Sequence, residues 1–177
     1  GIVHRFGAGR AAAKSFEKNC MSCHTNGTQI TGSDATVWSG STITDPNWGD
    51  FDYDGDGLPE EMNIGCESCH GPGSAHWDSA GQGRFIVSPS LLTPERESMI
   101  CGQCHSRPKG ALATDNPVDT SGRMMVAGSS RNTFLSKFAT SQLDGATSDF
   151  YADDRKHSKS HHQQYSDFIR SGLYKNE

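Results

Sequence analysis

Three copies of one five-residue pattern constrain this chain more than any other feature of its sequence. The pattern is C-x-x-C-H, found at residues 20–24, 66–70 and 101–105, and its copies use all 6 cysteines. C-x-x-C-H is the attachment signature of a c-type haem. The two thiols form thioethers to the porphyrin, and the adjoining histidine stands over the iron as its proximal ligand. The predicted attachment residues are Cys20, Cys23, Cys66, Cys69, Cys101 and Cys104, and the predicted proximal ligands of the three haems are His24, His70 and His105.

Zinc is the main alternative, because paired C-x-x-C motifs are also typical of zinc ribbons. A structural zinc takes four ligands, which six cysteines and their histidines match poorly. A histidine also follows the second cysteine all three times. With 8 histidines in 177 residues, chance alone would produce this about once in ten thousand chains. A thioredoxin-like redox pair would not need three copies. The pattern therefore favours haem over zinc or disulfides.

The apolar content is low for a chain that must build its own core. Only 33% of the residues are hydrophobic, and the mean hydropathy is -0.66. Three porphyrins would supply much of the missing apolar material, and 20 glycines and 7 prolines suit turns that wrap cofactors. We predict a single trihaem domain over residues 1–177, mainly irregular with short α-helices and minimal β-structure, wrapped around three covalent haems.

Length and charge also limit where the protein acts. No apolar run approaches the length of a membrane span, so we expect none. The formal net charge of -5 argues against nucleic acid as a partner. The chain begins at Gly1 instead of Met, so we expect a removed leader, and covalent haem attachment follows export. We expect an exported protein that is extracellular or at the cell surface, otherwise periplasmic.

Short helices and turns are predicted between the motifs. Residues 1–10 are interpreted as a flexible arm, and residues 11–19 as a helix that enters the first motif. Residues 25–49 should be a loop that covers a haem face with Trp38 and Trp48.

The second half of the chain has clearer start signals. Gly71-Pro72-Gly73 predicts a tight turn, and residues 85–87 are either a strand or haem packing. Thr93-Pro94 predicts the start of a helix that runs into the third motif. Further helices are expected over residues 132–139 and 161–171. The last of them would have Ser160 as its cap, Gln163 in a capping box and Gly172 as its stop.

An acidic stretch at residues 50–61 resembles the calcium loop of an EF-hand. One register uses Asp50, Asp52, Asp54 and Glu61, and a shifted register uses Asp52, Asp54 and Asp56 but ends on Asn63. Flanking helices are not predicted, and Pro59 would disturb an exiting one. The segment is therefore either a calcium loop outside an EF-hand or a solvated acidic turn.

Five histidines remain as candidate distal ligands of the irons: His4, His76, His157, His161 and His162. This surplus favours bis-histidine haems over axial Met124 or Met125. His76 follows the Gly-Pro-Gly turn too closely to reach the far side of the haem held by His70. We therefore expect it to ligate a neighbouring haem.

The remaining candidates lie near the two ends of the chain. On a helix, His161 and His162 would diverge by about 100°, so they cannot both ligate one iron. They would face two haems, or one would hydrogen-bond a propionate. His157 is the weakest candidate, and a surface histidine is its simpler interpretation. His4 either ligates an iron or is incidental in a frayed terminus.

The three motifs, the CESCHGPGSAH block and the HSKSHHQQYSDFIRSGLYKN tail resemble the multihaem cytochrome c family. Its members include periplasmic electron carriers and extracellular cytochromes that polymerise into haem-lined filaments. The resemblance leaves residues 25–60 and 106–150 largely unmatched. It implies bis-histidine haems in parallel and T-shaped pairs, and it supports His76, His161 and His162 as distal ligands. A further haem motif often follows such a tail, so a chain that stops at Glu177 is compatible with a truncated one.

The expected function is electron transfer through a row of three covalently bound bis-histidine haems, with no enzymatic activity. We expect a subunit of an extracellular cytochrome filament, a head-to-tail homopolymer in which His4 ligates a neighbour's iron. Its other partners would be redox proteins or extracellular acceptors. The alternatives are a soluble periplasmic carrier and an oxidoreductase with an open haem site. The three retained proximal histidines argue against the oxidoreductase.

Overall fold

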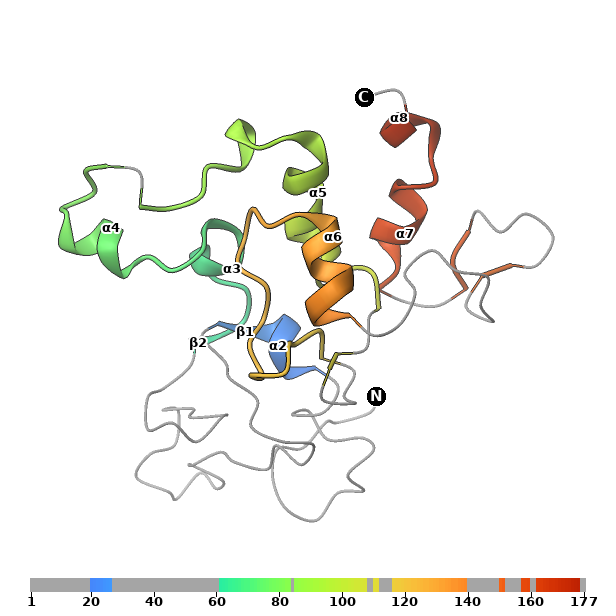
Figure 1. The fold of residues 1–177 in the computed structure, drawn as a ribbon, viewed down its shortest axis with the longest axis horizontal. Helices are drawn as coiled ribbons and strands as arrows, with labels where there is room; N and C mark the ends of the chain where they lie inside the picture. Colours follow the sequence, from blue (N-terminus) through green and yellow to red (C-terminus); the bar gives the residue numbers. More distant parts are fainter. Residues whose placement is uncertain are drawn as a thin grey trace, which may run out of the picture.

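Short helices joined by irregular chain make up the described part of the protein. The computed structural model describes residues 20–26, 61–83, 85–107, 110–111, 116–139, 150–151, 157–159 and 162–175 (Figure 1). The helices are α2 Met21–His24, α3 Cys66–His70, α4 Ser74–Asp78, η2 Pro89–Leu91, α5 Pro94–Gly102, α6 Arg131–Thr133, η3 Phe134–Phe138, α7 Gln164–Phe168 and α8 Gly172–Lys175. The strands are β1 Thr25–Asn26 and β2 Glu61–Met62. This agrees with the predicted fold class of short helices and minimal β-structure. The predicted arm, the helix over 11–19, and Trp38 and Trp48 lie outside the described residues.

Each C-x-x-C-H motif lies on or at the end of a helix. The first begins at Cys20, the N-cap of α2, the second forms α3, and the third begins in the last turn of α5 and continues past its end. In a helix, residues three apart lie on the same face. The two cysteines of a motif can therefore face one cofactor, which matches the spacing that thioether attachment needs.

The first two motifs are joined by a small antiparallel sheet. Thr25 pairs with Met62 and Asn26 with Glu61, directly after the first motif and just before the second. The N–H of Asn63 donates to the carbonyl of His24 at 2.7 Å, which extends the pairing by one residue. The predicted loop over 25–49 therefore begins with a strand. These bonds fix the spacing between the first and second motifs.

The predicted turn after the second motif is present. Gly71 has φ 73, a left-handed conformation that favours glycine, and its N–H donates to the carbonyl of Glu67 at 2.8 Å. The carboxylate of Glu67 also accepts from the N–H of Gly73 at 2.7 Å. This closes α3 and directs the chain into α4, which carries His76.

Helix α5 begins as predicted, with Thr93 as its N-cap and Pro94 as its first residue. It packs against α3, α6 and α7, and Figure 1 shows it between these elements. Gly102 permits the contact with α7, because a Cβ there would lie 2.8 Å from both the Met99 side chain and the Tyr165 ring. The end of α5, where the third motif begins, is therefore in close contact with the C-terminal segment.

The main apolar cluster lies between α5, α7 and the helix formed by α6 and η3. Its buried members are Met99, Met125, Phe134, Phe138, Ala139 and Tyr165. The helix predicted over 132–139 is confirmed, since α6 and η3 run together from residue 131 to residue 138. Ser130 caps it by accepting from the N–H of Thr133 at 3.2 Å. This cluster holds the third motif against the C-terminal segment.

Two local features are decided by the structure. Of the two alternatives for residues 85–87, the strand is excluded, and their backbone contacts the second motif. The C-terminal helix starts later than predicted: α7 begins at Gln164 with Gln163 as its N-cap, and Gly172 begins α8 instead of stopping a helix. Ser160, the predicted cap, lies outside the described residues.

The late start of α7 has a tertiary cause. His162 has φ 59, which is incompatible with a right-handed helix, so it lies before the helix and not on it. The N–H of Tyr165 donates to the carbonyl of His105 at 2.9 Å. A helix starting at residue 161 would need that N–H for its own first turn. The third motif takes this N–H instead.

Candidate haem-binding site

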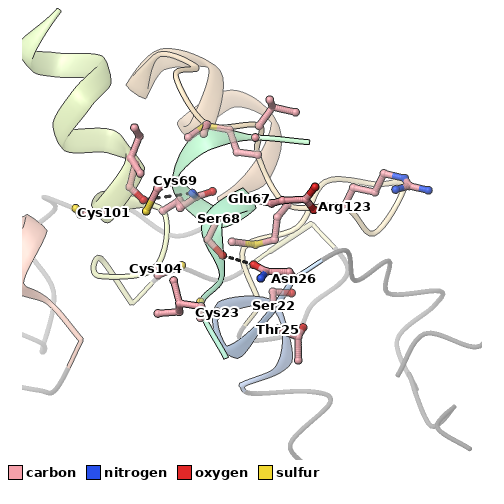
Figure 2. Close-up of a pocket in the computed structure, with 18 of the residues that line it drawn as sticks. Ser22, Cys23, Thr25, Asn26, Glu67, Ser68, Cys69, Cys101, Cys104 and Arg123 are labelled. Carbon is pink, nitrogen blue, oxygen red and sulfur yellow. Dashed lines mark hydrogen bonds between the residues drawn. The ribbon is translucent and has the colours of Figure 1, made fainter. Parts of the chain in front are cut away.

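The three motifs meet around one cavity of about 320 Å³ (Figure 2). Among the described residues, sulfur atoms from every motif line it, through Cys23, Cys69, Cys101 and Cys104. Its apolar wall comes from Ile64, Pro72, Ile100, Met124, Met125, Val126 and Ala127. Apolar walls with a few polar groups are typical of cofactor sites. The cavity thus combines surface suited to a porphyrin with the thiols that would attach it.

The third motif is next to both of the others. Figure 2 shows Cys104 beside Cys23 and Cys69 near Cys101. While the thiols are free, the hydrogen bond between Cys23 and Cys104 raises the pKa of Cys23 and lowers that of Cys104. Burial, followed by the neighbouring Cys69 sulfur, raises the pKa of Cys101. Each cysteine of the third motif therefore faces a different partner motif.

A further hydrogen bond ties the second motif to the first. The hydroxyl of Ser68, between the two cysteines of α3, donates to the side-chain oxygen of Asn26 in β1. The N–H of Ser22, between the two cysteines of the first motif, donates to the side-chain oxygen of Asn116 at 3.1 Å. Ser22, Asn26 and Asn116 are buried. The variable positions of the motifs therefore fix the attachment helices in place.

The proximal histidine of the second motif is oriented by a backbone carbonyl. The Nδ1 atom of His70 lies 2.7 Å from the carbonyl oxygen of Val87. The N–H of Val87 in turn donates to the carbonyl of His70 at 2.8 Å. Val87 therefore holds His70 at two points, by its ring and by its backbone carbonyl.

The proximal histidine of the third motif is oriented by a side chain. The Nδ1 atom of His105 lies 2.9 Å from Oε1 of Gln164, at the start of α7. The N–H of the next residue, Tyr165, donates to the carbonyl of His105. Two consecutive residues of the tail therefore hold His105 by its ring and by its backbone.

These two contacts determine which ring nitrogen can bind a metal. A carbonyl or carboxamide oxygen can only accept a hydrogen bond, so Nδ1 must carry the hydrogen in both His70 and His105. In the neutral ring, Nε2 then has a free lone pair. Metal-ligating histidines commonly donate the other ring N–H in this way. The residues present therefore fit haem, with Nε2 of His70 and His105 as iron ligands.

His24, in the first motif, is exposed, and its ring has no hydrogen-bond partner among the described residues. Its backbone carbonyl is held by Asn63. The described part of the chain therefore orients two of the three proximal rings. The position of His24 as a proximal ligand remains a prediction from its motif.

The candidate distal ligands are only partly brought to the site. His76 is half-buried in α4, and its Nδ1 is buried with no hydrogen-bond partner among the described residues. The ring of His162 lies 6.4 Å from that of His105, at an angle of 84°. His157 is exposed, next to the bridge between Phe150 and Ser158. His4 and His161 lie outside the described residues, so the structure places His76, His157 and His162 among the five candidates.

The methionines considered as axial ligands have different positions. Both line the cavity, but Met125 is only 4% exposed and also packs in the apolar cluster, whereas Met124 is half-buried. Both act as apolar wall in this arrangement. Packing is the more frequent role of methionine beside a large apolar group.

Most of the predicted calcium loop lies outside the described residues. Asp50, Asp52, Asp54 and Asp56 lie outside the described residues, and Glu61 is described only through its place in β2.

Among the residues that the structure describes, no three His, Cys, Asp or Glu side chains gather as a metal-ion site. The four-ligand cluster that the zinc alternative requires is therefore not formed there.

Three residues of the site were not predicted: Val87, Gln164 and Asn116. Each acts through one oxygen atom that contacts a motif far away in the sequence. No local pattern marks such an acceptor. The only indirect signal was the family-like tail that contains Gln164.

Comparison with solved structures finds a similar fold in one larger protein. The chain superposes on the crystal structure of the outer cell wall cytochrome OcwA with a TM-score of 0.56 and 24% sequence identity. The match covers 89% of this chain and 28% of OcwA, so this chain spans less than a third of that protein. The fold of this chain is similar to that of a segment of OcwA. No protein-family model and no curated protein sequence matches the chain.

Proposed function

We propose that this chain is an electron-transfer protein that holds three c-type haems through its three C-x-x-C-H motifs, and that it is not an enzyme. The observation that carries this proposal is the pair of oriented histidine rings, His70 and His105. In both rings, Nδ1 donates a hydrogen bond to an oxygen atom, which leaves the lone pair of Nε2 free to bind iron. Haem, when bound, supplies a one-electron redox couple.

The arrangement of the motifs suits transfer between cofactors. The third motif has one cysteine beside the first motif and the other beside the second. A group attached at Cys101 and Cys104 would therefore be next to the attachment points of both other haems. The protein fixes these positions with a buried hydrogen bond at Ser22 and a partly buried one at Ser68. We propose that electrons pass between the first and second haems through the third.

Bis-histidine ligation is the second part of the proposal. His76, His162 and the two histidines outside the described residues, His4 and His161, provide enough distal ligands for three irons. A haem with two protein ligands has no open position for a substrate. This favours a carrier over an oxidoreductase.

We also propose an extracellular location. Among the described residues, no helix is long and apolar enough to cross a membrane. The structurally similar OcwA is named as a cytochrome of the outer cell wall. A filament subunit at the cell surface is the specific form that we propose, and a soluble periplasmic carrier is the alternative.

Two measurements on the purified protein test the function. Mass spectrometry of the intact chain should show three haem additions and no thiol that can be alkylated. Visible spectra should show six-coordinate low-spin haem that is unchanged by carbon monoxide in the reduced state and by cyanide in the oxidised state.

The opposite results have distinct meanings. Bound zinc together with alkylatable cysteines would contradict haem attachment. Three haems of which one binds carbon monoxide or cyanide would support the oxidoreductase, because that haem would have an exchangeable axial position.

A further inference from the structure

The first residue of α7, Gln164, contacts the ring of His105, which lies 59 residues earlier in the sequence. This contact bears on the properties of a haem at the third motif. Oε1 of Gln164 is 2.9 Å from Nδ1 of His105, and the N–H of Tyr165 is 2.9 Å from the carbonyl of the same residue. The ring plane of His105 is thus set by a side chain that is replaceable. The matching contact in the second motif uses the backbone of Val87, which no substitution removes.

Gln164 can be changed without disturbing the packing of α7. Its own side chain is exposed, whereas Tyr165 is only 4% exposed and belongs to the apolar cluster. Asp167 also anchors the helix by accepting from the N–H and hydroxyl of Ser158 at 2.8 and 2.9 Å. Helix docking and ring orientation therefore depend on different side chains.

The chemistry of the contact predicts an effect on electron affinity. When Nδ1–H donates to an oxygen, the ring becomes more electron-rich, and Nε2 becomes a more basic ligand. A more basic axial ligand stabilises the oxidised, more positively charged iron. A stronger acceptor at position 164 should lower the reduction potential of the haem, and a missing acceptor should raise it.

We infer that Gln164 is the positioning residue of the third haem: it fixes the ring of His105 and sets the reduction potential of that haem separately from the other two. This inference depends on the proposed function, because it requires haem at Cys101 and Cys104. Since the third motif contacts both others, Gln164 would control the central step of transfer.

Two substitutions with opposite expected effects test the inference. Gln164→Glu keeps an acceptor and strengthens the bond by adding charge, so one of the three potentials should fall. Gln164→Leu removes the acceptor, so the same potential should rise. The potentials are measured by spectroelectrochemistry. Electron paramagnetic resonance should show changed g-values for one low-spin haem in Gln164→Leu, because its ring is no longer held in one orientation.

A matched control separates the hydrogen bond from simple charge. Leu173→Glu adds the same charge at a position in α8 that is 73% exposed, without an acceptor at His105. It should leave the g-values unchanged and shift the potential less than Gln164→Glu does.

The outcomes are distinguishable. If both Gln164 variants keep three haems and leave every potential and g-value unchanged, Gln164 does not position the ring. Equal shifts in Gln164→Glu and Leu173→Glu would likewise overturn the inference, since charge alone would explain them. A wild-type protein without haem would instead refute the proposed function.

Discussion

At the residue scale, the two oriented proximal histidines differ in the kind of group that accepts a hydrogen bond from each ring. His70 is held by the backbone of Val87, and His105 by the side chain of Gln164. A backbone acceptor is independent of side-chain identity, so its contact can change only if the chain path changes. A side-chain acceptor can be altered by one substitution. The second and third haems should therefore differ in how readily mutation changes their potentials.

Asn116 holds the backbone of the first motif at Ser22 and contacts no proximal ring, and its removal should destabilise the fold. Its side-chain oxygen accepts from the N–H of Ser22, and the two residues are 1% and 5% exposed. Asn116→Ala would leave a buried donor without this partner, at a cost of about 1–3 kcal/mol in the free energy of unfolding. Denaturant unfolding followed by circular dichroism measures this cost.

Asn132→Ala is the matched control for this prediction. Asn132 is exposed in α6, so its replacement should change the free energy of unfolding by less than about 0.5 kcal/mol. Equal stabilities of the two variants would mean that the bond to Ser22 contributes nothing measurable.

At the scale of elements, the short β1–β2 pairing connects the acidic segment to the haem motifs. Glu61, the last residue of the candidate calcium loop, pairs with Asn26, two residues after His24. An ion bound in residues 50–61 would therefore restrain the start of β2 and, through it, the spacing of the first two motifs.

This connection makes the calcium hypothesis testable by stability. Asp52 and Asp54 are ligands in both candidate registers, so changing both to Asn should lower the melting temperature in calcium. In a chelating buffer the variant and the wild type should melt alike. If the two proteins behave identically in both buffers, the segment is an ordinary acidic turn.

Helix α7 shows how an element far away in the sequence completes a haem motif. Its contact with α5 depends on Gly102, where a side chain would collide with Tyr165. The cation of Arg170, two residues after the end of α7, lies 3.8 Å from the Phe150 ring and links the C-terminal segment to Phe150. The third motif is therefore held in part by Gln164 and Tyr165, the first of which lies 59 residues after His105.

At the scale of the whole molecule, the three motifs converge on one cavity instead of lying apart along the chain. Covalent haems at converging motifs would be close enough for rapid exchange within one subunit. Long-distance conduction would then require contact between the haems of successive subunits.

His4 is the residue that we expect to make this contact. The His4→Ala protein should keep three haems, show one high-spin haem and remain monomeric, because a neighbour's iron would lose its distal ligand. Electron microscopy of the native and variant proteins, with their visible spectra, measures both effects. Filaments of fully low-spin His4→Ala protein would show that the residue is not a ligand.

The attachment residues were predicted from the sequence alone, because a covalent haem needs its cysteines and histidine at a fixed local spacing. Thr93-Pro94 and residues 132–139 were predicted for the same reason, since caps and turns are local. The tail was predicted less well. His162 and Gln163 precede α7 because the N–H of Tyr165 bonds to His105, a contact that no local pattern encodes.

Tertiary structure decided which oxygen atoms complete the site. Val87, Gln164 and Asn116 contact motif residues that are 17, 59 and 94 positions away in the sequence. Nothing in the sequence distinguishes these three acceptors from the many other residues that carry an oxygen acceptor. It also decided that the third motif faces both others. Spacing along a chain limits what can bind within one helical turn, but only the packed fold determines which distant groups reach a ring nitrogen.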